Sequence, residues 1–180
     1  MKTVLIAAFD GTGNEAEALR QSLEVFGWFV AVRYVARPRD LIEILSGQTA
    51  FSPEHIILSC HGEPGRILMP PLGESVYGSE EPRGDFQAKT VSDYLTLSQK
   101  TILNLGCCSG QEAMAKVFSE KNTYIAPVDY VSGSAALCFA VRFYYELTQN
   151  GRTAEQACAL AASVDPDTAL FRFFPPNPPR

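Results

Sequence analysis

The sequence has no excess of positive charge. Its 15 Lys and Arg residues stand against 20 Asp and Glu residues, which gives a formal net charge of -5. A nucleic-acid-binding domain needs a basic face, so this balance argues against a nucleic-acid partner and leaves small molecules, peptides and proteins.

Long hydrophobic runs are also missing. The apolar stretch near the start, residues 4–9, is stopped by Asp10 and Gly11, far short of the roughly 20 residues that a bilayer-spanning helix requires. The stretch is also too short for the core of a signal peptide, and no cleavage site of small residues follows it. We therefore expect no membrane contact and no secretion signal, and we interpret residues 4–9 as a buried strand.

Cysteine is present, but without the spacing of a disulfide framework or a metal site. The five cysteines are an odd number, none forms a Cys-x-x-Cys pair, and Cys107 and Cys108 are adjacent. This usage favours a reducing compartment, so we expect a cytoplasmic protein. A zinc site that combines Cys60 and His61 with the adjacent cysteines is conceivable but lacks the usual spaced pair. We expect no metal and no other cofactor.

Apolar residues are numerous enough for one core. Hydrophobic residues make up 46% of the 180 residues and charged residues 19%, which is typical of a single globular domain and not of a disordered chain. Neither an internal repeat nor a linker is visible in the sequence. We expect one domain over residues 1–172 and an irregular, proline-rich tail over residues 173–180.

Strand and helix patterns alternate along the chain. Short apolar, β-branched runs predict five strands, at residues 2–8, 28–35, 55–60, 101–105 and 123–127. Helical spacing of apolar residues predicts helices at residues 15–26, 40–45, 90–97, 111–118, 133–147 and 153–163. The intervening residues 63–89 are rich in Gly, Pro and charge and predict a long loop, with a short hairpin around residues 67–69.

This order of elements indicates an α/β protein, a three-layer α/β/α sandwich with a mostly parallel sheet. Crossovers between parallel strands are right-handed and leave few topologies, so we expect the strand order 2-1-3-4-5. In such sheets, ligands bind beyond the carboxyl ends of the strands.

A histidine and a cysteine follow two neighbouring strands of the expected sheet. His61 and Gly62 end the third strand, and Cys107 follows the fourth. Adjacent strands lie about 4.8 Å apart, so both side chains reach one edge, where an imidazole can take the proton of a thiol and the thiolate can attack a substrate. The adjoining glycines allow a substrate backbone to approach and offer N–H groups to an oxyanion. These positions predict a thiol-based catalytic site, with core packing of the cysteine as the alternative.

The residues around both positions resemble the caspase family. Its opening, a Gly-Thr turn that leads into the first helix, resembles residues 10–20, and its step into the second strand resembles residues 26–30. Its Ser-His-Gly strand is similar to residues 57–65, and the strand and turn that carry its nucleophile are similar to residues 102–110. The C-terminal stretch from residue 125 onward is more similar to the bacterial CHAT relatives. The resemblance covers residues 3–162 in all.

The resemblance implies a mechanism and a set of site residues. Cys107 would be the nucleophile and His61 the general base and acid, with an oxyanion hole from the N–H groups of Gly62 and Cys107. The implied activity is that of an endopeptidase, which hydrolyses a peptide bond of a protein or peptide substrate through a thioester acyl-enzyme. A regulatory protein partner is a further expectation. Cys108 stays open as the nucleophile, or as a redox partner of Cys107, although adjacent cysteines pair poorly.

The residues that would set specificity depart from one branch of the family. Caspases that cut after aspartate resemble one another in having an arginine just before the Gly-Thr turn, and Phe9 stands near that place here. Asp129 lies where relatives that cut after Lys or Arg keep an acidic pocket residue, so the resemblance implies a basic side chain at the cut site. Asp129 can equally be the N-cap or a turn residue before the next helix.

Two other functions stay open on sequence alone. A caspase-like chain of the CHAT type can be catalytically inactive and serve as a signalling or binding module. The same strand ends could also form the small-molecule site of a flavodoxin-like domain. The turn at residues 10–13 is a weak phosphate-loop signal, since it lacks the full Gly-x-Gly-x-x-Gly pattern and a P-loop lysine.

Overall fold

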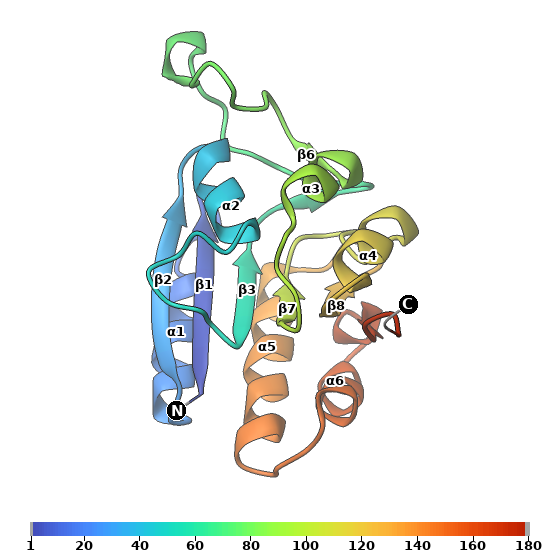
Figure 1. Ribbon diagram of the computed structural model, residues 1–180. Helices are drawn as coiled ribbons and strands as arrows, with labels where there is room; N and C mark the ends of the chain where they lie inside the picture. Colours follow the sequence, from blue (N-terminus) through green and yellow to red (C-terminus); the bar gives the residue numbers. More distant parts are fainter. Residues whose placement is uncertain (1, 179–180) are drawn as a thin grey trace.

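A six-stranded sheet forms the centre of the computed structural model, which describes residues 2–178 (Figure 1). The strand order is β2-β1-β3-β7-β8-β9. The strands are β1 (Thr3–Phe9), β2 (Phe29–Val35), β3 (His55–Ser59), β7 (Thr101–Asn104), β8 (Thr123–Pro127) and β9 (Phe171–Phe174). All neighbours pair in parallel except β9, which runs antiparallel to β8. The expected order 2-1-3-4-5 is confirmed, with β9 added at one edge.

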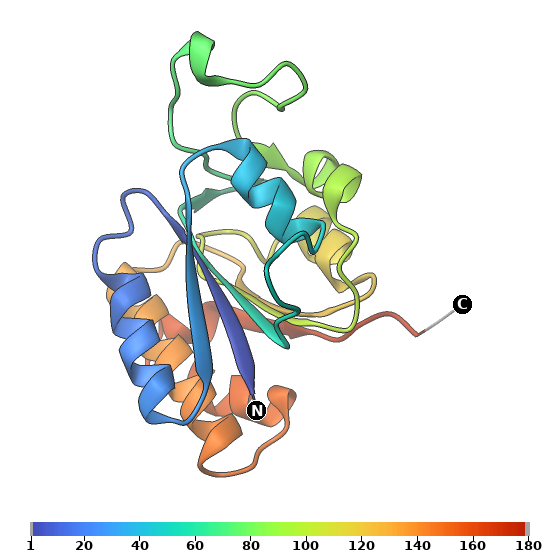
Figure 2. The ribbon, with the colours of Figure 1, turned by 60° about the vertical axis from the view of Figure 1, so that its left-hand side comes forward.

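Helices cover both faces of the sheet, which confirms the three-layer α/β/α arrangement (Figure 2). One face is covered by α1 (Glu15–Val25), α5 (Gly133–Thr148) and α6 (Ala154–Ala162). The other face is covered by α2 (Pro38–Leu45), α3 (Ala88–Tyr94) and α4 (Glu112–Ser119). None of these helices within residues 2–178 combines the length and the apolar character of a membrane-spanning segment.

Strand β1 shows how one apolar run serves two cores. Val4 and Ile6 lie in the core beneath α1 and α5, whereas Leu5 and Ala7 lie in the core beneath α2. All four side chains are buried. A parallel strand with helices on both faces has no polar side, so its sequence is a continuous apolar run. That pattern is the one that predicts a buried strand at residues 4–9.

The end of the chain corrects one expectation. The sequence predicts an irregular tail from residue 173, but β9 includes Phe173 and Phe174. These two rings pack against opposite cores, and β9 follows directly on a 3-10 helix, η2 (Thr168–Leu170). Pro175 and Pro176 follow the strand, as expected for residues without a ladder N–H. A four-residue aromatic run is too short to show a strand periodicity, and residues 179–180 of the expected tail lie outside the described residues.

The long segment between β3 and β7 contains a second, small sheet. Its three antiparallel strands are β4 (Gly62–Glu63), β5 (Arg66–Ile67) and β6 (Phe86–Gln87). Residues 68–85, here called the arm, leave this sheet, include a 3-10 helix η1 (Glu74–Val76) and project from the top of the molecule in Figures 1 and 2. The expected hairpin is thus part of a three-stranded sheet at the carboxyl end of β3.

Candidate active site

The pairing of β3 with β7 places His61 and Cys107 at the same level of the sheet edge. The two strands are parallel and in register, with Leu58 opposite Asn104. His61 lies three residues beyond Leu58, and Cys107 lies three residues beyond Asn104. The carboxyl ends of parallel strands lie at one edge of a sheet. Both residues therefore follow the same edge, with the chain turning at Gly106 and Cys107.

The backbones that carry the two residues are in direct contact at Gly62. A Cβ atom on Gly62 would lie 3.0 Å from the carbonyl carbon of Gly106 and 3.1 Å from the backbone nitrogen of Cys107. It would lie closer still to the Cys107 carbonyl oxygen. These separations leave no room for a side chain, so the glycine after His61 is needed for the two strand ends to meet.

The thiol of Cys107 is partly accessible and lies beside the β8–α5 connection. Its Sγ is 3.4 Å from the Val131 N–H nitrogen and 3.4 Å from the Val131 carbonyl oxygen. The Cys107 backbone N–H has no hydrogen-bond acceptor within residues 2–178. An accessible sulfur next to an unused backbone donor can attack a carbonyl and then hold the oxyanion that forms.

The adjacent Cys108 is placed differently. Its side chain is 1% exposed, its backbone N–H donates to the Asp129 carbonyl at 3.1 Å, and its φ of 58° turns the chain in the left-handed region. Burial raises the pKa of the Cys108 thiol, and the negative charges of Asp129 and Glu63 act in the same direction. A buried thiol that resists ionisation is a poor nucleophile, so the structure favours Cys107 over Cys108.

His61 is exposed at the mouth of the site and is contacted by the turn after β1. Its Nε2 lies 3.2 Å from the position that a Cβ on Gly11 would take, and Gly11 has a φ of 81°. The His61 carbonyl oxygen accepts a hydrogen bond of 3.0 Å from Leu68 N–H, at the base of the arm. His61 therefore contacts the β1–α1 turn through its ring and the base of the arm through its backbone.

Glu15 is a residue near the site that sequence reasoning missed. It opens α1, and its carboxylate accepts a 2.5 Å hydrogen bond from the hydroxyl of Ser59, the buried last residue of β3. Burial raises the pKa of Glu15, while the Ser59 hydrogen bond and the charge of His61 lower it. An acidic residue in the first turn of a helix is usually a partner of the helix dipole, so only the tertiary structure reveals this contact with β3.

Asp129 follows β8 and is exposed at the same edge of the sheet. Its Oδ1 accepts a 2.8 Å hydrogen bond from the Tyr130 N–H. The N-cap of α5 is Ser132, whose hydroxyl accepts from Ala135 N–H. Asp129 is thus a turn residue and not the N-cap of α5, which was the other role the sequence left open.

The zinc interpretation is not supported by the placement of its residues. Within residues 2–178, no three His, Cys, Asp or Glu side chains are grouped so that they could hold a metal ion. Cys60 is buried and its Sγ donates to Asn104 Oδ1 at 3.3 Å. Burial also raises the pKa of the Cys60 thiol strongly, whereas a zinc ligand must be a thiolate.

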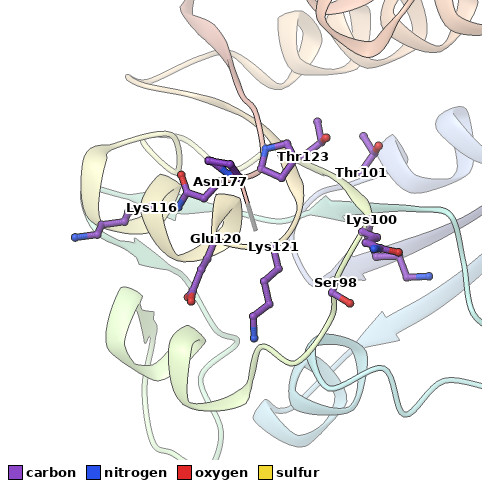
Figure 3. Close-up of a pocket in the computed structure, with 11 residues that line it drawn as sticks. Ser98, Lys100, Thr101, Lys116, Glu120, Lys121, Thr123 and Asn177 are labelled. Atoms are coloured by element: carbon purple, nitrogen blue, oxygen red, sulfur yellow. The ribbon is translucent and has the colours of Figure 1, made fainter. Parts of the chain in front are cut away.

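One cavity lies away from these residues. Its volume is about 870 Å³, and it borders the amino ends of β7 and β8, with Lys100, Lys116 and Lys121 in its lining (Figure 3). A smaller hollow of about 350 Å³ includes Ser132 and Asp167, next to the β8–α5 connection. An extended peptide binds along an open surface, so the placement of reactive groups, and not cavity size, decides which edge carries the chemistry.

Comparison with known proteins finds a similarity in three-dimensional structure but none among family models or curated sequences. No protein-family model matches the sequence, and no curated protein matches it. Among solved structures, the chain is similar to the Arg-specific cysteine proteinase gingipain R, with a TM-score of 0.54 and 13% identity. The fold is similar to that of this cysteine proteinase. The similarity covers 82% of this chain but only 37% of the gingipain R chain, and at this identity it supports the fold alone.

Proposed function

We propose that this chain is a cysteine endopeptidase in which Cys107 is the nucleophile and His61 is the general base and acid. The observation that carries the proposal is the parallel, in-register pairing of β3 with β7, whose carboxyl ends precede His61 and Cys107, together with the close approach of Gly62 to the Cys107 backbone. The partly accessible Cys107 and the buried Cys108 support the choice of nucleophile. The likeness of the fold to a cysteine proteinase is in keeping with this chemistry.

The reaction follows from these groups. His61 takes the thiol proton of Cys107, and the sulfur forms a bond to the carbonyl carbon of the scissile peptide. The N–H groups of Gly62 and Cys107 donate to the resulting oxyanion. The C–N bond then breaks as His61 returns the proton to the leaving amine, which leaves a thioester. Water, deprotonated by His61, attacks the thioester and restores the free thiol.

The same proposal assigns a basic side chain to the substrate on the amino side of the cut. Asp129 presents an exposed carboxylate at the site edge, and Glu63 lies close enough for both charges to raise the pKa of Cys108. Glu63 is paired with Arg66, so the Asp129 carboxylate is the charge that would attract Lys or Arg and repel Asp or Glu. Gingipain R, with a similar fold, is Arg-specific. We propose a protein or peptide substrate in the cytoplasm and a regulatory protein partner.

An electrophile-capped peptide with a terminal arginine tests the dyad. We expect it to modify Cys107, as read by intact mass and peptide mapping, because the basic side chain would seat the electrophile beside the thiolate. The Cys107→Ala variant should lose the label, whereas the matched Cys108→Ala variant should keep it. Equal labelling of wild type and Cys107→Ala would exclude the proposed nucleophile.

A catalytically inactive binding module is the second candidate, and one contact favours it. The Cys107 thiol donates to the Val131 carbonyl oxygen at 3.4 Å, so its S–H group is engaged with the β8–α5 connection. A module of this kind would bind a peptide without reaction. Absence of label on Cys107 in a folded wild-type protein that still binds the uncapped peptide would select this function.

A further inference from the structure

The two edges of the central sheet differ in how they are protected against further strand pairing. β9 forms one edge; it has only four residues and is followed by Pro175 and Pro176, which have no N–H to offer another strand. β2 forms the other edge, at the left of the sheet in Figure 1, and its seven residues include neither proline nor lysine. A long apolar edge strand without such residues can pair with another chain.

Half of the backbone groups of β2 point away from the sheet. The Phe29 N–H donates to the Lys2 carbonyl at 2.9 Å, so Phe29 faces β1. Alternate residues of a parallel strand bond to the same neighbour, and the N–H and C=O groups of Val30, Val32 and Tyr34 therefore point outward. β2 has no strand on that side, and no other backbone within residues 2–178 bonds to these groups.

Large apolar side chains are exposed along the same edge. Tyr34 is 77% exposed and Phe29 is 47% exposed, and Val25, the last residue of the preceding helix α1, is 83% exposed. Arg33, the charged residue of β2, is paired with Glu43 of α2. The edge thus offers backbone hydrogen bonds and apolar surface, with its own charge already neutralised, which is typical of an association surface.

We propose that β2 pairs antiparallel with β2 of a second copy of this chain, about a twofold axis at Val32, so that the two sheets join into one. In this register Val32 lies opposite Val32 of the second copy, and Val30 lies opposite Tyr34 of the second copy. Each such pair exchanges two N–H···O bonds, so all the outward backbone groups of both strands are satisfied. This inference does not depend on the proposed function.

The side chains favour this register over its neighbours. A register centred on Arg33 would place two guanidinium groups opposite each other, which is destabilising. A register centred on Ala31 would place Tyr34 beyond the first residue of the other strand and leave its backbone groups unpaired. In the proposed register Arg33 lies opposite Ala31, and no like charges meet.

The strand also matches itself when its direction is reversed, which identifies a second copy as the occupant. Val30 and Val32 contact the core beneath α1, so Tyr34, two residues further along the strand, lies on the same side of the sheet. Tyrosine opposite valine is one of the favourable cross-strand pairs, and the twofold axis forms it twice. Such self-complementarity is what an interface between two identical subunits requires.

The pairing has a defined end point. It uses the β2 edge of both copies, so association stops at the dimer. Because the two β2 strands run in opposite directions, the carboxyl ends of the two sheets lie at opposite ends of the joined sheet. The residues that follow those ends, His61 and Cys107 among them, are therefore not covered by the second copy.

Sedimentation velocity from about 1 to 200 µM tests the dimer. We expect a reversible monomer–dimer equilibrium with a micromolar Kd, as for other small interfaces. Tyr34→Lys should raise this Kd at least tenfold, because it removes both Tyr–Val pairs and places a lysine on the edge. The control Val164→Lys, at a half-exposed residue after α6, should leave the Kd unchanged. Both side chains are exposed, so both variants should melt as wild type does.

A monomer at every concentration would overturn the proposal. So would an unchanged Kd in Tyr34→Lys, or assembly beyond the dimer.

Cysteine cross-linking tests the register in a chain whose Cys107 and Cys138 are replaced by serine. With diamide as the oxidant, Val32→Cys should form a disulfide dimer on a non-reducing gel, because the two Cα atoms at the axis would lie about 5.5 Å apart. Tyr34→Cys is the matched control: its two copies would lie more than about 12 Å apart and should stay monomeric. Cross-linking at position 34 and not at 32, or at neither position, would contradict the proposed pairing.

Discussion

Gly62 is the residue at which the backbone after His61 comes into contact with the backbone of Cys107. Its missing side chain lets the chain after His61 pass against the backbone of Gly106 and Cys107. The proposed oxyanion hole uses the N–H groups of these same two residues, Gly62 and Cys107. A Cβ atom at residue 62 would therefore keep the backbone after His61 from approaching the backbone of Cys107.

Asp129 carries the prediction for specificity at the residue scale. We expect Asp129→Asn to lower kcat/KM about tenfold for peptides with Arg at the cut site, because the variant removes the charge that would pair with the guanidinium. Peptides with a neutral residue there should be affected little. The exposed Asp93 on α3 offers a control of equal charge change, Asp93→Asn, far along the chain from the site. An unchanged preference for Arg over neutral residues would remove Asp129 from the pocket.

At the scale of elements, two features bear on the candidate site: the register between β3 and β7, and the attachment of the arm to α2. β3 and β7 bring the proposed dyad, His61 and Cys107, to one edge of the sheet because the two strands pair in parallel and in register. The arm, which starts at the small sheet beside His61, is held on α2 by one carboxylate: Glu81 accepts from Arg37 Nε at 2.9 Å and from Arg39 N–H at 3.1 Å. The Arg37 guanidinium lowers the pKa of Glu81 to about 2, so this anchor stays ionised at neutral pH.

Removal of this anchor should loosen the arm alone. We expect Glu81→Gln to increase the rate at which trypsin cuts after Arg83 severalfold, because the arm loses its ionic contact with Arg37 and opens locally more often. The effect on global unfolding should be small, as for other ion pairs near a surface. Glu80→Gln, a change at the exposed neighbouring residue, is the control. Equal cleavage rates in both variants would show that Glu81 does not hold the arm.

At the scale of the whole molecule, the two apolar cores and one largely buried histidine contribute to the stability. His55 begins β3 at the amino end of the sheet, with its ring 4.8 Å from the Trp28 ring and its Nδ1 3.3 Å from the Tyr144 hydroxyl. Burial, with a smaller contribution from Lys2, lowers the pKa of His55 to about 4 from 6.5. The folded protein therefore keeps this ring neutral where the unfolded chain is already protonated.

This histidine predicts a loss of stability in mild acid. As the pH falls from 6.5 to 4, the unfolded chain binds a proton that the folded protein does not bind, so the free energy of unfolding should fall by on the order of 3 kcal/mol. Urea unfolding at several pH values measures this slope. The His55→Gln variant cannot titrate there and should show a shallower slope. An identical slope in both proteins would exclude His55 as its source.

The sequence by itself determined the order of elements and which strand ends carry reactive residues. Continuous apolar runs mark strands that helices cover on both faces, and His61 and Cys107 each follow such a run. These are local signals, carried by neighbours in the chain, and the sheet confirms them. The position of the Gly after His61 is also visible in the sequence, although its reason is not.

Only the tertiary structure decided the contacts between distant segments. The inward turn of Glu15 to Ser59, the burial of Cys108 beside Asp129, the addition of β9 to the sheet and the anchoring of the arm by Glu81 all join residues far apart in sequence. Each depends on desolvation or on strand pairing, which arise when separate elements pack and leave no periodic trace in either segment alone.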